Sequence, residues 1–176
     1  MVLSPATYRR FAPIFSRLKT RSRLRRALLR WAVVSGWAAF SRGDIELMLI
    51  RYAPDVEFTF APGLQTLGLK GTYRGHDQMR AGLRELVEDW NPMEMEPSFV
   101  VDTGEVVVNL GFIHARGRTS GARVDTEIAQ VLTVRAGLAA IDHAWDTWRD
   151  GLRAAGLDPD AVSLPRPRSD QPSNQA

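Results

Sequence analysis

The chain has 176 residues, 44% of which are hydrophobic, and it carries 23 basic and 20 acidic side chains but no cysteine. That length fits one folded domain with short extensions, and the composition excludes an intrinsically disordered protein for most of the chain. The lack of cysteine excludes disulfides, zinc–thiolate sites and thiol nucleophiles, and it favours a cytoplasmic location.

The basic residues are concentrated at the beginning of the chain. Ten of them precede Asp44 and no acidic residue does, so residues 44–176 have a net charge of −7. We interpret residues 1–21 as a weakly ordered leader and the arginines that follow as a solvated helix face. The densest basic run, residues 17–30, has no aromatic side chain for base stacking, so we do not expect nucleic acid binding. No stretch approaches the ~18 apolar residues of a membrane span, and we expect no membrane partner.

Residues 22–157 show the patterns of a folded domain. Ser22 is a suitable N-cap, and apolar side chains at three- and four-residue steps predict a helix that ends near residues 42–43. Asp44 can cap a second helix over about 45–53, which Pro54 stops. Residues 56–60 alternate between apolar and polar, which is typical of a strand, and the glycine- and proline-rich stretch 61–75 indicates a loop.

The second half of the domain is predicted to be one helix followed by four strands. The helix spans about 77–90, and the strands span about 94–102, 105–118, 122–135 and 138–148, separated by glycine-containing turns. A short helix over about 150–156 follows, and residues 158–176 have the composition of a disordered tail. Helices grouped before an antiparallel sheet predict an α+β fold.

Five short segments carry a resemblance to a known superfamily: Trp37–Glu46, Tyr52–Phe58, Tyr73–Arg80, Arg135–Leu138 and Ala154–Leu157. Their order and spacing resemble the SnoaL-like group, which includes nuclear transport factor 2 and ketosteroid isomerase. The resemblance implies a cone-shaped α+β barrel, with three N-terminal helices packed on a strongly curved, mostly antiparallel sheet. It also implies a pocket for a small hydrophobic molecule, no cofactor, and a homodimer.

The resemblance leaves two classes of function open. One is a cofactor-free isomerase, cyclase or epoxide-hydrolase-like enzyme, and the other is a non-catalytic ligand-binding or dimerisation module. Alignment on the shared glycines places the polar catalytic positions of ketosteroid isomerases on Gly36, Phe60 and Ala129. The catalytic aspartate of SnoaL-type cyclases falls on Thr147, beside Asp146, which we expect on the opposite face of a strand.

Glu127 and His143 form the remaining candidate for acid/base chemistry. A three-residue hairpin loop at residues 135–137 would pair Val134 with Leu138 and make Glu127 and His143 diagonal neighbours on the pocket face. They could act as a general acid/base couple, or they could be a buried polar pair without a catalytic role. With a two-residue loop, Glu127 would face Asp146 instead.

Other polar residues give weaker indications. Asp125, Glu127 and Arg116 supply the composition of an epoxide-hydrolase site but no motif. His76 and His114 lack a third partner at metal-ligand spacing, so we expect no metal. We expect the pocket to be lined by eight residues: Trp37, Phe58, Phe60, Tyr73, Trp90, Phe112, Trp145 and Thr147. Ile128, Leu132 and Val134 are expected on the outward face, where a partner subunit or the first helix would cover them.

Overall fold

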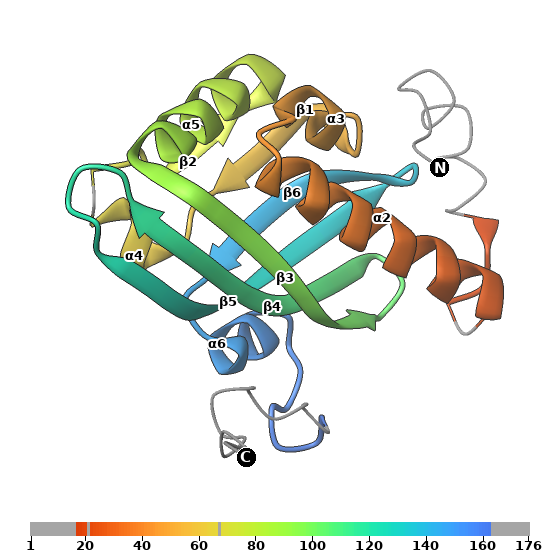
Figure 1. Ribbon diagram of the computed structural model, residues 1–176. Helices are drawn as coiled ribbons and strands as arrows, with labels where there is room; N and C mark the ends of the chain where they lie inside the picture. Colours follow the sequence, from red (N-terminus) through yellow and green to blue (C-terminus); the bar gives the residue numbers. More distant parts are fainter. Residues whose placement is uncertain (1–16, 21, 67, 163–176) are drawn as a thin grey trace, which may run out of the picture.

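A computed structural model describes residues 17–20, 22–66 and 68–162, which form a six-stranded sheet with helices on both of its faces (Figure 1). Residues 1–16 of the predicted leader and 163–176 of the predicted tail lie outside the described residues. The fold class is α+β, as the order of the sequence patterns predicted.

The first helices begin where the sequence places their caps. α2 (Arg23–Ser41) follows Ser22, whose Oγ accepts a hydrogen bond from the Arg25 backbone N–H at 3.1 Å. α3 (Ile45–Leu49) follows Asp44, whose carboxylate accepts from the Leu47 backbone N–H at 3.0 Å. α3 is shorter than predicted, because the chain from Tyr52 onward is already paired with the sheet. Among the described residues, no helix combines the length and apolarity that crossing a bilayer requires.

The remaining helices lie beside the sheet and at the end of the domain. α5 (Gly75–Asp89) corresponds to the predicted third helix, and α6 (Trp148–Ala154) to the predicted last one. The predicted loop 61–75 contains the short helix α4 (Pro62–Gln65) and a three-residue strand. α2 and α5 cover one face of the sheet, which we call the inner face, and α6 packs on the opposite, outer face (Figure 1).

The strand order is β2-β1-β6-β5-β4-β3, and every neighbouring pair is antiparallel except β1 and β6, which are parallel. The last strand of the chain therefore lies in the interior of the sheet, next to the first. The strands are β1 (Tyr52–Thr59), β2 (Thr72–Arg74), β3 (Trp90–Asp102), β4 (Val106–Gly117), β5 (Arg123–Arg135) and β6 (Leu138–Trp145).

The hairpin between β5 and β6 differs from the sequence-based expectation. Its loop has two residues, Ala136 and Gly137, both with positive φ (50° and 80°), so Arg135 pairs with Leu138 and Val134 with Ala139. Positive φ at both central residues is the type I′ geometry, whose twist matches that of the flanking strands. A register shift then follows between Thr133 and Val134. The predicted three-residue loop and its pairing are wrong.

The hydrophobic core is divided by the sheet. The larger cluster fills the inner face beneath α2 and α5 and includes Ile128, Leu132 and Ala144. The smaller cluster lies on the outer face under α6 and includes Leu110, Ala129, Trp148 and Leu152. Ile128 and Leu132 are buried in the inner cluster and Val134 packs against it, because α2 and α5 cover this face of the sheet. Their predicted outward position is wrong.

Candidate functional site

The inner face of the sheet carries an ionisable side chain at its centre. Asp142 lies on β6 next to Phe58 of β1 and Leu132 of β5, and none of its surface is exposed. It shares this face with Ala144 and is surrounded by the larger hydrophobic cluster. A carboxyl group in such a position is rare unless hydrogen bonds compensate its burial.

A chain of buried hydrogen bonds joins Asp142 to α2. The Tyr52 hydroxyl and the Gln130 amide Nε2 both donate to Oδ2 of Asp142, at 2.8 and 3.1 Å. The indole N–H of Trp37 donates to Oε1 of Gln130 at 2.8 Å. Because an indole N–H can only donate, this contact fixes the orientation of the Gln130 amide. The four residues come from α2, β1, β5 and β6, so the network assembles only in the folded chain.

The surroundings of Asp142 shift its titration into the physiological range. Burial raises the pKa of this carboxyl from 3.8 to about 7, while the hydrogen bond from Tyr52 acts in the opposite direction. Burial, together with the neighbouring Asp142, also raises the pKa of Tyr52 well above its usual value, so the phenol stays protonated. Asp142 can therefore exist as an acid or as a base near neutral pH, whereas Tyr52 remains a donor.

The two carboxyl oxygens of Asp142 have different surroundings. Oδ2 accepts two hydrogen bonds, but Oδ1 is buried and has no hydrogen-bonding partner among the described residues. When the carboxyl is neutral, its proton therefore belongs on Oδ1. The amide oxygen of Asn109, which lies opposite Gln130 on the inner face, is also buried, and no described residue donates a hydrogen bond to it. Unsatisfied buried acceptors are costly, and they are common where a ligand or water supplies the missing donor.

Aromatic side chains form the apolar wall near this polar group. Phe58 and Phe60 pack edge to face with ring centroids 4.8 Å apart, and Phe60 meets Tyr73 in the same way at 5.4 Å. Trp37 lies against Gly111 of β4, where a Cβ atom would overlap the indole ring. Trp37, Phe58, Phe60 and Tyr73 are all buried in the inner cluster, and Trp90 packs against it half-buried.

The other predicted pocket residues lie on the outer face or outside the sheet. Phe112 and Trp145 pack half-buried against the smaller cluster. Thr147 is exposed and caps α6, accepting from the Asp150 backbone N–H at 3.1 Å. Asp146 is also exposed, and its carboxylate accepts from the Gly63 backbone N–H at 2.9–3.0 Å. The structure therefore does not bring these residues together with the inner aromatic wall.

Glu127 and His143 share the outer face but do not lie as the predicted register had them. His143 pairs with Val131, and Trp145 pairs with Ala129, so the sequence-based pairing of these strands is wrong. The Glu127 carboxylate accepts from the Trp148 backbone N–H at 3.0 Å, at the start of α6. A catalytic role for Glu127 and His143 stays a prediction, but the strand register that made them diagonal neighbours is not the observed one.

A second polar group on the outer face involves the predicted epoxide-hydrolase carboxylate. Asp125 lies opposite His114, and their side chains are 2.7 Å apart. Arg116 lies opposite Arg123 instead of a carboxylate. Within the described part of the chain, no group of three or more histidine, aspartate or glutamate side chains has the geometry to hold a metal ion.

Sequence reasoning missed the polar residues at the centre of the inner face. Asp142 stands in the run Leu138–Ala144, and Gln130 lies in the apolar run Ile128–Leu132 of the neighbouring strand. A polar residue inside each of two predicted neighbouring strands was the available signal. The sequence does not show that α2 and α5 cover the face that these two residues share, and this packing makes them the centre of the inner face.

The chain belongs to the SnoaL-like domain family, whose model matches residues 33–141, more than half of its length. No curated protein matches the chain.

Solved structures have the same fold. A nuclear transport factor 2-like protein of unknown function from Burkholderia pseudomallei is 27% identical, with 70% of this chain and 94% of that one covered (TM-score 0.61). TerC, co-crystallised with polyporic acid, is 25% identical over 72% of this chain and 94% of its own (TM-score 0.59). A candidate polyketide cyclase from Xanthomonas campestris pv. campestris is 18% identical over 69% and 91% (TM-score 0.57), a likeness of fold alone.

Proposed function

We propose that this SnoaL-like domain binds a small hydrophobic molecule over the inner face of the sheet and transfers a proton with Asp142. The observation that carries the proposal is the buried Oδ1 of Asp142, which has no hydrogen-bonding partner in the described part of the chain although Oδ2 of the same carboxyl has two. A ligand with a polar group beside an apolar body would supply the missing contact and pack against Phe58, Phe60 and Tyr73. Because Asp142 is fully buried, such a ligand must displace part of the inner cluster.

The chemistry suited to this arrangement is cofactor-independent isomerisation or cyclisation through an enolate. Ionised Asp142 would take a proton from the carbon beside a carbonyl, and the C–H electron pair would move into the enolate. The protonated Oδ1 would then return the proton to another carbon of the conjugated system, so that atoms and charge balance. Tyr52 and Gln130 would hold the carboxyl by Oδ2 and leave Oδ1 directed to the substrate.

The solved relatives suggest which compounds to try. TerC was co-crystallised with polyporic acid, and the Xanthomonas protein is described as a candidate polyketide cyclase. An aromatic hydroxyquinone or polyketide-like compound combines an apolar body with enolic hydroxyl groups. Such a molecule matches an aromatic wall whose member Phe58 lies beside the carboxyl group of Asp142.

The test separates binding from proton transfer. Polyporic acid and a panel of hydrophobic carbonyl, epoxide and polyketide-like compounds are screened by thermal shift, and binders are then incubated in D2O to follow deuterium entry next to the carbonyl. We expect Asp142→Asn to abolish deuterium entry, with Asp125→Asn, which alters an exposed outer-face carboxylate, as the matched control. Deuterium entry that persists in Asp142→Asn would overturn the catalytic proposal.

The same assay tests two other hypotheses, namely catalysis by Glu127 and His143 and ligand binding without catalysis. Loss of deuterium entry in Glu127→Gln and His143→Ala, but not in Asp142→Asn, would favour the outer-face couple. A ligand that stabilises the protein without any deuterium entry would favour a passive binding module.

The family resemblance implies a homodimer, and we also propose that its two copies associate through the outer face. Phe99 and Ile141 are both 39% exposed there, although neighbouring side chains are covered by α6. A monomer mass in light scattering, or a dimer that persists in Phe99→Ser/Ile141→Ser, would contradict this arrangement.

A further inference from the structure

α2 is apolar on two opposite sides. One side, which includes Leu29, Val33 and Phe40, is buried against the sheet. At 100° per residue, Leu24, Leu28, Trp31 and Val34 fall on the side that faces away from it. We call these four residues the outer stripe of α2. A surface helix is normally polar on this side, so an apolar stripe there indicates a partner.

The outer stripe is substantially exposed. Leu24, Leu28 and Val34 have 56%, 37% and 44% of their surface accessible, whereas Trp31 is half-buried. In Figure 1, α2 lies across the inner face of the sheet, and no other described element covers its far side. The family match begins at residue 33, so most of this stripe precedes the part of the chain that the family shares.

Positive charge flanks the outer stripe on both sides. Arg23, Arg26 and Arg30 are exposed along one edge, and none of them forms an ion pair with a described residue. On the other edge, the Arg51 guanidinium lies 5.8 Å from the centre of the Trp31 ring and donates to the carbonyl oxygens of Ala32 and Leu47 and to Ser35 Oγ, so the accessible charge is that of Arg23, Arg26 and Arg30. No acidic residue occurs between Arg17 and Gly43.

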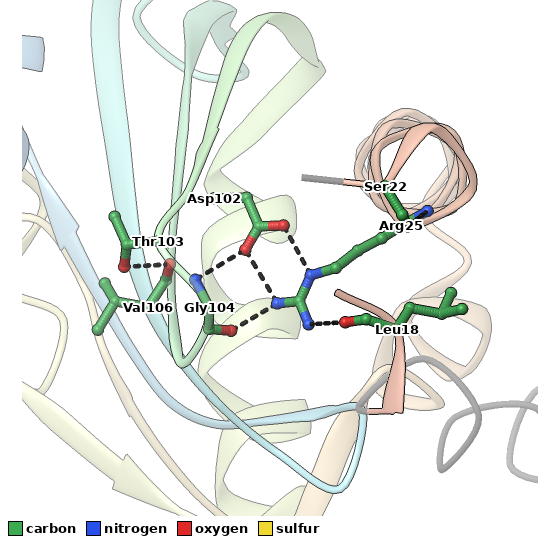
Figure 2. Close-up of polar contacts among 7 residues, drawn as sticks. All are labelled: Leu18, Ser22, Arg25, Asp102, Thr103, Gly104 and Val106. Carbon is green, nitrogen blue, oxygen red and sulfur yellow. Dashed lines mark hydrogen bonds and ion pairs between the residues drawn. The ribbon is translucent and has the colours of Figure 1, made fainter. Parts of the chain in front are cut away.

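A buried ion pair holds this part of α2 in one orientation (Figure 2). Arg25 points from α2 to the β3–β4 turn, where Nε and one terminal nitrogen donate to the two oxygens of Asp102 at 2.7 and 2.9 Å. The same guanidinium donates to the carbonyl oxygens of Gly104 and Leu18. Both ionic side chains are less than one-tenth exposed. With Arg25 fixed inward, Leu24, Leu28 and the flanking arginines remain turned outward.

We propose that the outer stripe of α2, with its arginine edges, docks on an anionic lipid surface. An apolar stripe bordered by arginines is the arrangement in which a helix lies in a bilayer interface, with its arginines at the depth of the phosphates. Pairing of two α2 helices through the same stripe would bring their arginine edges together, which like-charge repulsion opposes. This surface is separate from the inner-face site, so its test does not depend on the proposed catalysis.

The test measures vesicle binding of the full chain. Vesicles of equal parts phosphatidylcholine and phosphatidylglycerol are compared with phosphatidylcholine alone by co-sedimentation and by Trp31 fluorescence. We expect binding to the anionic vesicles only, with a blue shift that is absent in Trp31→Phe. Leu24→Ser/Leu28→Ser should lower the partition coefficient by about tenfold or more, because both exposed side chains would leave the interface. Helical circular dichroism confirms that these surface variants are folded.

The charge requirement has a matched control. Arg23→Gln/Arg26→Gln/Arg30→Gln should weaken binding by about a hundredfold, since each arginine near an anionic surface strengthens binding by about fivefold. The control Arg116→Gln/Arg118→Gln/Arg123→Gln removes the same charge from exposed residues of the β4–β5 hairpin and should bind almost normally.

Three results would overturn the proposal. One is absence of binding to anionic vesicles, with retention on immobilised poly-glutamate, which would indicate an acidic protein partner. Another is an equal loss of vesicle binding in the two triple arginine variants, which would indicate attraction by net charge alone. The third is an oligomer that Leu24→Ser/Leu28→Ser dissociates while vesicle binding is unchanged, which would assign the stripe to a second copy.

Discussion

The carboxyl group of Asp142 loses its hydration on folding, and this loss dominates its titration. Its pKa is higher in the folded chain (about 7) than in the unfolded chain (3.8), because burial disfavours the charged form. The folded state therefore binds more protons between these two values. The stabilising contribution of the group is fully present below pH 3.8 and is lost as pH rises through about 7.

This titration predicts how Asp142→Asn changes stability. A shift of this size corresponds to about 4 kcal/mol between the two ends of the pH range. The free energy of unfolding is measured in urea at pH 5 and at pH 8. Between these pH values it should fall by up to about 3 kcal/mol more in the unsubstituted protein than in Asp142→Asn. Parallel pH profiles for the two proteins would show that Asp142 is not the titrating group.

Gly111 is required by the close approach of Trp37. A Cβ atom at this position would overlap both the Trp37 ring and the Glu96 carbonyl oxygen, neither of which can move without displacing α2 or β3. We expect Gly111→Ala to lower the free energy of unfolding by about 1–3 kcal/mol, as in other overpacked cores. The comparison is Gly36→Ala, whose Cβ meets only the flexible Arg51 side chain and should change stability by less than about 1 kcal/mol.

At the scale of the elements, the Arg25–Asp102 ion pair ties α2 to the β3–β4 turn. Removing one partner leaves the other buried and unpaired, and Asp102 also accepts from the Gly104 backbone N–H at 3.0 Å. Asp102→Ala should therefore lower the free energy of unfolding, measured by chemical denaturation, by about 3–5 kcal/mol. Glu57→Ala, which breaks the exposed pair with Arg74, should cost less than about 1 kcal/mol. Similar losses in the two variants would contradict the assigned role of burial.

Most elements could be predicted because their signals are local. Ser22 and Asp44 mark helix starts by capping chemistry, and alternation of apolar residues marks β4, β5 and β6. The end of α3 and the existence of α4 and β2 were missed, because pairing of Tyr52 with β6 and of Tyr73 with β1 depends on residues far away in the chain.

For the whole molecule, the inner and outer clusters share strands β4, β5 and β6 and should unfold together. Trp37 lies in the inner cluster and Trp148 in the outer one. In each of the variants Trp37→Phe and Trp148→Phe, we expect unfolding in urea to have the same midpoint by fluorescence as by circular dichroism. Separate transitions for the two sides of the sheet would show that the clusters are independent units.

The amino-acid sequence by itself determined the class of fold and the positions of the turns, since capping residues, glycines and alternation act over a few neighbours. Only the tertiary structure decided which side chains enter the interior. α2 and α5 cover the face that carries Asp142 and Gln130, whereas α6 packs on the face that carries Glu127 and His143. The side-chain period of two assigns residues to one face of a strand or the other, but it does not determine which face the helices cover. The same alternation that predicted the strands therefore could not, without the packing of the helices, identify the site.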